Sequence, residues 1–253
     1  MPRVNDSTEL VMIKRGEFSY HPSGEYLRGN YPVNSPAVVV HFTSDFLIMK
    51  RQVSQTEYAA CIRDGACKAL DRAQRGHTSP DLPVVGVSWT DATAYAAWLS
   101  ARTGHHYRLP SDVQWAFAAG SAYKDEEVIE TSDPNDPAQR WLAEYEAEAR
   151  RKTGDTQLKP FGHFGVSSTG LLDIAGSVWD WTDTCNSRQI INKDSAPVSA
   201  PERNCSIRVV AGRHRGYIAD FIRDPRGGAC SVGIPPSNLG FRLVREIADK
   251  RAG

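Results

Sequence analysis

Several charged side chains gather near the C-terminal end of the chain, and they hold most of the chemistry that the sequence could support. Within fourteen residues stand Arg213, His214, Arg215, Asp220, Arg223, Asp224 and Arg226. Arginine and histidine together could hold an anionic group through charge-assisted hydrogen bonds. A lone histidine among arginines is more often a surface or hydrogen-bonded residue. Both interpretations stay open from the sequence.

The five cysteines bear on redox chemistry and on compartment: Cys61, Cys67, Cys185, Cys205 and Cys230. No pair has a metal-binding C-x-x-C or Cys/His spacing, so zinc is not indicated. Close pairs such as Cys61 and Cys67 fit disulfides, which favour an oxidising compartment. Cys230 stands between small residues and could be a reactive thiol, disulfide-bonded or simply buried. We expect a periplasmic protein whose leader has been removed, with a cytoplasmic protein as the alternative, because the N-terminus lacks the apolar segment of a signal peptide.

The bulk composition narrows the function classes. The 253 residues carry a net charge of zero and 40% hydrophobic residues. The mixture of acids and bases gives no reason to expect a nucleic-acid partner. No apolar run reaches the roughly 20 residues that a membrane span needs.

Short strands and capped helices must position these groups. Ser54 with Glu57, and Ser111 with Gln114, form capping boxes that open helices. An apolar stripe beginning near Thr90 predicts a longer helix that ends at Gly104. Strands are predicted over 10–18, 38–42 and 46–49, a surface helix over 140–152, and a loop over 186–204.

The stretch Gly170–Asp183 combines glycines, tryptophans and acids in an order that suits neither a helix nor an ordinary strand. Its Gly-Ser step predicts a tight turn that brings the backbone close to another group. The alternative is a turn whose Trp179 and Trp181 only anchor the core.

Four motifs stand in a fixed order: Pro83–Asp91, Tyr107–Trp115, Gly170–Asp183 and Ser237–Arg245. Together they resemble the formylglycine-generating-enzyme (sulfatase-modifying-factor) family, from about Leu10 to Glu246. The resemblance implies one domain over 9–247 with an α+β, C-type-lectin-like fold, in which a twisted antiparallel sheet carries packed helices and long loops. It also implies that Phe241 lies in the core and that Arg242 bridges a carboxylate.

The family's reaction depends on two cysteines that bind copper(I), because thiolates are soft ligands and good nucleophiles. Counted back from the Asn238–Arg242 motif, those positions hold His214 and Ala219. Cys230 lies eleven residues beyond the second position. We therefore expect the sulfatase-activating chemistry to be absent. The iron-binding H-x3-H-x-E pattern of the related sulfoxide synthases is also missing from the sequence.

The resemblance further implies a structural calcium site in the tryptophan motif. Ser177 and Asp180 replace the family's Asn and Glu ligands, so each side chain is shorter. The alternative is a calcium-free turn held by hydrogen bonds from Ser177.

Three functions follow as expectations. The first is a periplasmic accessory or maturation protein, similar to NirV-like members encoded beside copper nitrite reductase, with a periplasmic client such as a copper enzyme. The second is a metal-dependent oxidoreductase, similar to the pyoverdine-maturation member, with copper or iron in a site rebuilt around His214, Asp220 and Cys230. The third is a binding module on a lectin-like scaffold, whose ligand-binding residues would be Arg213, Arg215, Arg223 and Trp181.

Overall fold

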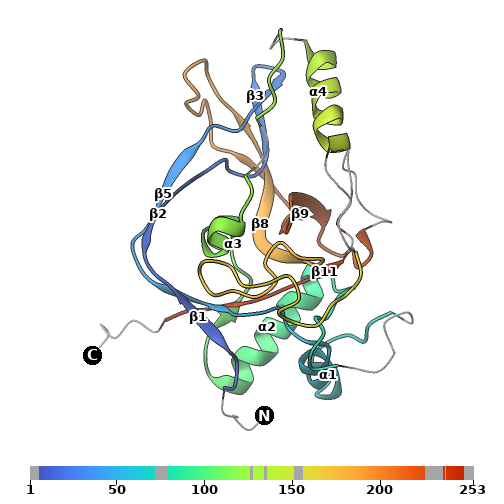
Figure 1. Ribbon diagram of the computed structural model, residues 1–253. Coiled ribbons are helices and arrows are strands. Elements are labelled where there is room, and N and C mark those ends of the chain that lie inside the picture. The colour runs from blue at the N-terminus through green and yellow to red at the C-terminus, as the bar shows by residue number, and fades with distance from the viewer. Residues whose placement is uncertain are drawn as a thin grey trace.

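The described residues form three small sheets packed against helices, in the α+β arrangement expected from the motifs (Figure 1). The computed structural model describes residues 6–71, 79–125, 128–133, 136–150, 156–225, 236 and 238–247, with the side chains of 148–150 left aside. Cys230 and Arg226 lie outside these residues, so their predicted roles stay predictions.

The first sheet joins the two ends of the chain. Its antiparallel order is β1 (Leu10–Ile13), β6 (Phe46–Met49), β12 (Val244–Arg245) and β7 (Tyr107–Arg108). Next to it, β2 (Gly16–Tyr20) and β5 (Val38–Phe42) form a separate antiparallel ribbon. Strand β12 directly follows the Asn238–Arg242 motif, so that motif is anchored in the sheet.

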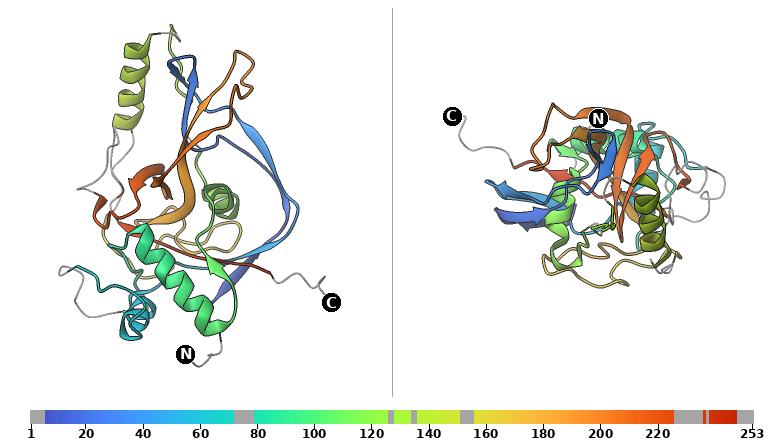
Figure 2. Two further views of the ribbon diagram at one scale, coloured as in Figure 1. Left: turned by 180° about the vertical axis from the view of Figure 1, so that it is seen from behind. Right: turned by 90° about the horizontal axis from the view of Figure 1, so that it is seen from above.

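The second sheet carries the tryptophan motif. Its order is β10 (Arg215–Ala219), β9 (Glu202–Ala211), β8 (Trp179–Ile190), β3 (Glu25–Arg28) and β4 (Tyr31–Val33), and β11 (Leu239–Gly240) pairs in parallel with β8. The predicted loop over 186–204 is wrong in part, because β8 continues to Ile190 and β9 starts at Glu202. These strands pair up to Arg188 and Glu202 in a hairpin that projects from the body (Figures 1 and 2). Its side chains are mostly polar, so the sequence shows no alternation of apolar and polar residues that would identify the strands.

The helical segments are α1 (Gln55–Arg63), α2 (Trp89–Thr103), α3 (Asp112–Ala119), the 3-10 helix η2 (Gly120–Ala122) and α4 (Pro137–Arg150). Side-chain caps mark the starts of α1, α2 and α3. The boxes at Ser54 and Ser111 are confirmed. Helix α2 starts earlier than predicted, because Ser88 caps it with Asp91 in the box position. Gly104 ends it in the left-handed conformation, with φ 76°.

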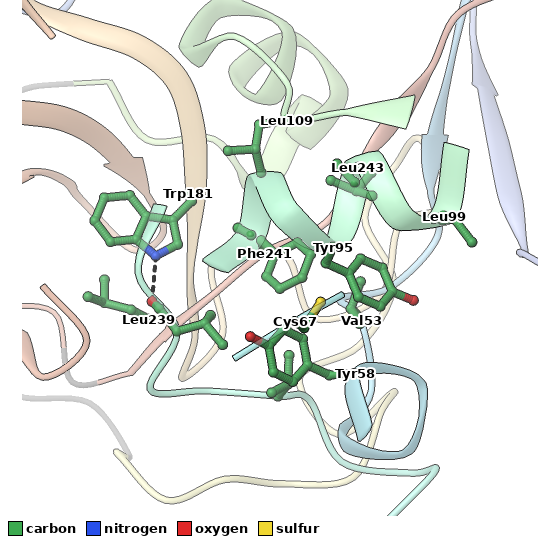
Figure 3. Packing of buried hydrophobic residues seen from close by; sticks show 14 of the residues in the cluster. Val53, Tyr58, Cys67, Tyr95, Leu99, Leu109, Trp181, Leu239, Phe241 and Leu243 are labelled. Atoms are coloured by element: carbon green, nitrogen blue, oxygen red, sulfur yellow. Dashed lines mark hydrogen bonds between the residues drawn. The ribbon is translucent and has the colours of Figure 1, made fainter. Parts of the chain in front are cut away.

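The main core lies between α1, α2 and the motif strands (Figure 3). Trp181 and Phe241 are wholly buried there, and the Trp181 indole N–H donates to the carbonyl of Val87 at 2.8 Å. Gly240 lets the strands approach closely, since a Cβ there would lie 2.6 Å from Val178 Cγ1 and 2.8 Å from the carbonyl oxygen of Val84. The tryptophan motif and the Asn238–Arg242 motif are therefore the two halves of one packed unit.

Two disulfides fasten the structure. Cys61 bonds to Cys67 at the end of α1, and Cys185 bonds to Cys205 across the β8–β9 hairpin. The first is buried in the core, whereas Cys205 in the second is exposed.

Candidate functional site

A buried ion pair links the tryptophan motif to the C-terminal motif. Asp180 Oδ2 accepts from Arg242 Nε at 2.7 Å and from the Trp115 indole N–H at 2.9 Å. The side chains of Asp180 and Arg242 are 1% and 0% exposed. Arg242 also donates to the carbonyls of Lys50 and Leu172. The carboxylate that Arg242 was expected to bridge is therefore Asp180.

This arrangement does not fit calcium held by Ser177 and Asp180. Calcium takes six to eight oxygen ligands, several of them carboxylate. Arg242 neutralises Asp180, which leaves one buried oxygen, Oδ1, without a hydrogen-bond partner. The nearby Asp173 already accepts amide N–H groups on both oxygens. The described residues contain no cluster of three or more His, Cys, Asp or Glu side chains suited to a metal.

The positions of the family's cysteine pair lie on and just before strand β10. His214 is half-buried, with its Nδ1 3.0 Å from the carbonyl oxygen of Arg215 and its ring edge-on to Trp179. The Trp179 indole N–H in turn donates to the carbonyl of His214 at 3.0 Å. Ala219 ends the strand and offers only a methyl group. This pair of residues does not fit copper(I), which prefers soft thiolate ligands.

Two of the arginines predicted to bind a ligand, Arg213 and Arg215, are instead bonded to other groups of the protein. Arg213 Nε donates to the carbonyl of Gly176 at 3.0 Å, and its guanidinium lies beside Trp179. Arg215 is 4% exposed and forms an ion pair of 3.2 Å with Asp112. Their positive charges are therefore used to fasten loops to the sheet.

Arg223 is the third predicted ligand-binding arginine, and it fastens the segment after β10 to the start of α2. Nε and Nη2 donate to the two oxygens of Asp91 at 2.7 and 2.8 Å, and Nη1 donates to the carbonyl of Ala69. Burial by itself raises the pKa of Asp91. The hydrogen bonds from Arg223 and Ser88 outweigh burial and hold the pKa of Asp91 below its usual value.

Asp91 should therefore make stability depend on pH. A carboxyl group with a lowered folded-state pKa stabilises the fold above its unfolded pKa of about 3.9, and that contribution is lost as pH falls through the folded value. We expect Arg223→Met to lower Tm at pH 7 and to flatten the acid dependence of Tm below about pH 4. Thermal melts from pH 7 to pH 2 measure both effects. Equal acid slopes in the variant and the wild type would contradict this role of the pair.

The same contact forms one wall of a surface hollow, which we call the Phe221 hollow. It has a volume of about 340 Å³ and is lined by Lys68, Ala69, Ser88, Thr90, Asp91, Phe221 and Arg223. The Phe221 side chain is 70% exposed. Phe221 follows Ala219, the second of the family's two cysteine positions, by two residues in the sequence. Sequence reasoning missed Phe221 and Lys68, although an aromatic residue directly after Asp220 is visible in the charged stretch.

The remaining predicted residues are divided between core and surface. Trp181 lies wholly in the core, with 0% of its side chain exposed, and its ligand-binding role stays a prediction. The backbone amide of Asp220 donates to Ser206, and the Asp220 carbonyl accepts from Thr90, at the edge of the hollow. No described helix is long and apolar enough to cross a membrane.

Comparison with known proteins agrees with this geometry. A family model described as sulfatase-modifying factor enzyme 1-like domain matches residues 1–247. The inactive Cα-formylglycine-generating enzyme 2 of Mus musculus is 34% identical over 168 residues, 63% of this chain and 52% of that protein. The formylglycine-generating enzyme of Streptomyces coelicolor is 28% identical over 69% of this chain and 55% of its own length.

Two further similarities cover nearly all of the chain. The serine/threonine-protein kinase Pkn1 of Chlamydia trachomatis is 26% identical over 95% of this chain but only 38% of the kinase. The structure of PvdO from Pseudomonas aeruginosa superposes with a TM-score of 0.61 at 22% identity, covering 98% of this chain and 97% of PvdO. The chain thus spans about two-fifths to just over half of the curated relatives' lengths. By its matched residues and its α+β fold, this chain belongs to the sulfatase-modifying factor enzyme 1-like family.

Proposed function

We propose that the chain is an extracytoplasmic accessory protein that acts by binding a client, without the copper and cysteine chemistry of the formylglycine-generating enzymes. One observation carries the proposal. The two positions where that chemistry needs thiolates hold His214, packed against Trp179, and Ala219, which has no ligand atom. The two disulfides support an oxidising compartment.

The Phe221 hollow is the surface that we propose for the client. An exposed aromatic side chain beside charged groups is typical of the anchors that dominate protein interfaces. Phe221 and Lys68 offer an apolar contact and an exposed cation at one place. The proposed client is a periplasmic protein, and a copper enzyme is the candidate that the resemblance to NirV-like members suggests.

The first experiment tests the absence of the family reaction. The purified, oxidised protein is loaded with copper(I), dialysed and incubated with a cysteine-containing sulfatase peptide and oxygen. We expect no aldehyde on the peptide and no copper in stoichiometric amount by mass spectrometry. Copper or iron near one per chain that is lost in His214→Ala would overturn the proposal in favour of an oxidoreductase rebuilt around His214.

The second experiment tests the surface. Binding of a purified periplasmic copper enzyme is measured by calorimetry with wild type, Phe221→Ala and Tyr145→Ala. Phe221 is expected to behave as a hot spot, so its truncation should weaken binding by about tenfold or more. Tyr145 is 55% exposed on α4 and serves as the matched aromatic control. If both variants lose the same affinity, or if neither variant changes the affinity, the Phe221 hollow is not the interface.

A further inference from the structure

The two disulfides of the chain differ in a way that the accessory role does not require. Cys61 and Cys67 are 0% and 8% exposed and belong to the main core. Cys185 is half-buried and Cys205 is exposed, on a hairpin that projects from the body. A thiolate in solution can therefore approach Cys205, whereas the core shields the other disulfide.

The strand ladder is interrupted at this disulfide. Cys185 pairs with Arg208, but the next residue of β8, Asn186, pairs with Asn204. Cys205, Ser206 and Ile207 are consequently extra residues on β9, in the manner of a bulge, which re-aims side chains and often lies beside functional sites. The bulge turns Cys205 outward and brings Arg208 opposite Cys185.

Arg208 then lies against one sulfur of the pair. Its Nη1 donates to Cys185 Sγ at 3.3 Å and also to the carbonyl oxygen and carboxylate of Asp183 at 3.1 and 3.3 Å. Its guanidinium stacks on Trp89, with Cζ 3.8 Å from the ring centroid. The side chain is only 11% exposed, and its Nε is buried with no hydrogen-bond partner among the residues that the structure describes. The positive charge is thus held in place beside Cys185.

Asp183 does not cancel this charge. Its side chain is 50% exposed, and it meets Arg208 through one oxygen at 3.3 Å. Water screens the half-exposed Asp183 carboxylate, whereas the Arg208 guanidinium is largely buried. Arg208 is therefore able to stabilise a second negative charge on the sulfur beside it.

From these contacts we propose that Cys185–Cys205 is a thiol–disulfide exchange site, with Cys205 as the attacked sulfur, Cys185 as the leaving sulfur and Arg208 as the group that stabilises the leaving thiolate. The substrate is a thiol. Its thiolate forms a bond to Cys205 Sγ, the Cys185–Cys205 bond breaks, and the electron pair of that bond goes to Cys185 Sγ. The products are a mixed disulfide on Cys205 and a Cys185 thiolate. Exchange is faster when the leaving thiolate is stabilised, and the guanidinium of Arg208 beside Cys185 Sγ supplies that stabilisation.

The test follows the exchange in the intact, oxidised protein. Reduced glutathione is added at pH 7, samples are quenched with N-ethylmaleimide, and peptide mass spectrometry locates each adduct. We expect glutathione on Cys205 and maleimide on Cys185, while Cys61–Cys67 stays oxidised. Glutathione mainly on Cys185, or equal reaction at both disulfides, would overturn the proposal.

Variants test the role of Arg208. Arg208→Met keeps a long side chain against Trp89 and is expected to slow exchange by about tenfold, whereas Arg208→Lys should retain most of the rate. Arg188→Met is the matched control, because Arg188 is on the same hairpin but pairs with Glu25. Folding is checked by circular dichroism. An unchanged rate in folded Arg208→Met, or the same slowing in Arg188→Met, would overturn the role of Arg208.

A second arm distinguishes small thiols from protein thiols. A cysteine-containing unstructured peptide replaces glutathione at equal thiolate concentration. Faster reaction of the peptide would assign the site to protein thiols, and faster reaction of glutathione would assign it to small thiols. No adduct on Cys205 with either thiol would refute the site itself. Because Phe221 takes no part in this test, its result is independent of the client-binding proposal.

Discussion

Asp180→Ala is expected to lower the free energy of unfolding by about 3–5 kcal/mol, because it leaves the charge of Arg242 buried without a counter-ion. Arg242 is 0% exposed, and its Nε loses a partner at 2.7 Å. The Trp115 indole N–H loses its acceptor in the same substitution. Urea unfolding of the oxidised protein, followed by far-ultraviolet circular dichroism, measures the change.

A surface ion pair of similar geometry supplies the matched control. Arg188 and Glu25 meet at 2.9 Å with side chains that are 53% and 47% exposed. Glu25→Ala should cost less than about 1 kcal/mol, because water screens the exposed pair. The double variant Asp180→Leu/Arg242→Met should lose less free energy of unfolding than the sum of the losses in the two single variants, because it removes both charges. Similar small losses for Asp180→Ala and Glu25→Ala would contradict the structural role of the buried pair.

Local sequence signals were sufficient for much of the fold. The capping boxes at Ser54 and Ser111 specify helix starts through contacts within four residues, and the structure has both. The four ordered motifs gave the α+β family fold, and they placed Phe241 in the core. The hairpin beyond Asn186 was missed because its residues are mostly polar, and even its buried position is a glutamine, Gln189, so the segment shows no hydrophobic period.

The site was harder to predict, because its contacts join residues far apart in the chain. The sequence shows that Arg213, Arg215 and Arg223 are basic, but not that carbonyls and the carboxylates of Asp91 and Asp112 satisfy them. These partners come from α2, α3 and loops that only the fold brings together. For the same reason, Arg242 could be expected to bridge a carboxylate before that carboxylate could be named.

Trp181→Ala is also expected to lower the free energy of unfolding by about 3–5 kcal/mol. The substitution removes a wholly buried indole and leaves a cavity in the core. The indole N–H also satisfies the carbonyl of Val87, which directly precedes the Ser88 cap of α2. Trp181→Phe retains most of the apolar contact but leaves that carbonyl unpaired, so a smaller loss of about 1–3 kcal/mol is expected. Guanidinium unfolding followed by circular dichroism provides the values. Trp141→Ala, at a position 56% exposed on α4, should change stability by less than about 0.5 kcal/mol.

The Trp181 variants also separate a core role from a ligand-binding one. A core residue affects binding only through the fraction of folded protein, so folded Trp181→Phe should bind the client as wild type does, whereas Phe221→Ala should not. The reverse pattern, with unchanged stability but weakened binding in Trp181→Phe, would return Trp181 to the binding surface. Since the Trp181 side chain is 0% exposed and its indole N–H is bonded to the Val87 carbonyl just before α2, a ligand could reach the ring only if this segment moved away from β8. Such a movement would break the Trp181–Val87 hydrogen bond, and it would therefore lower the free energy of unfolding measured in guanidinium.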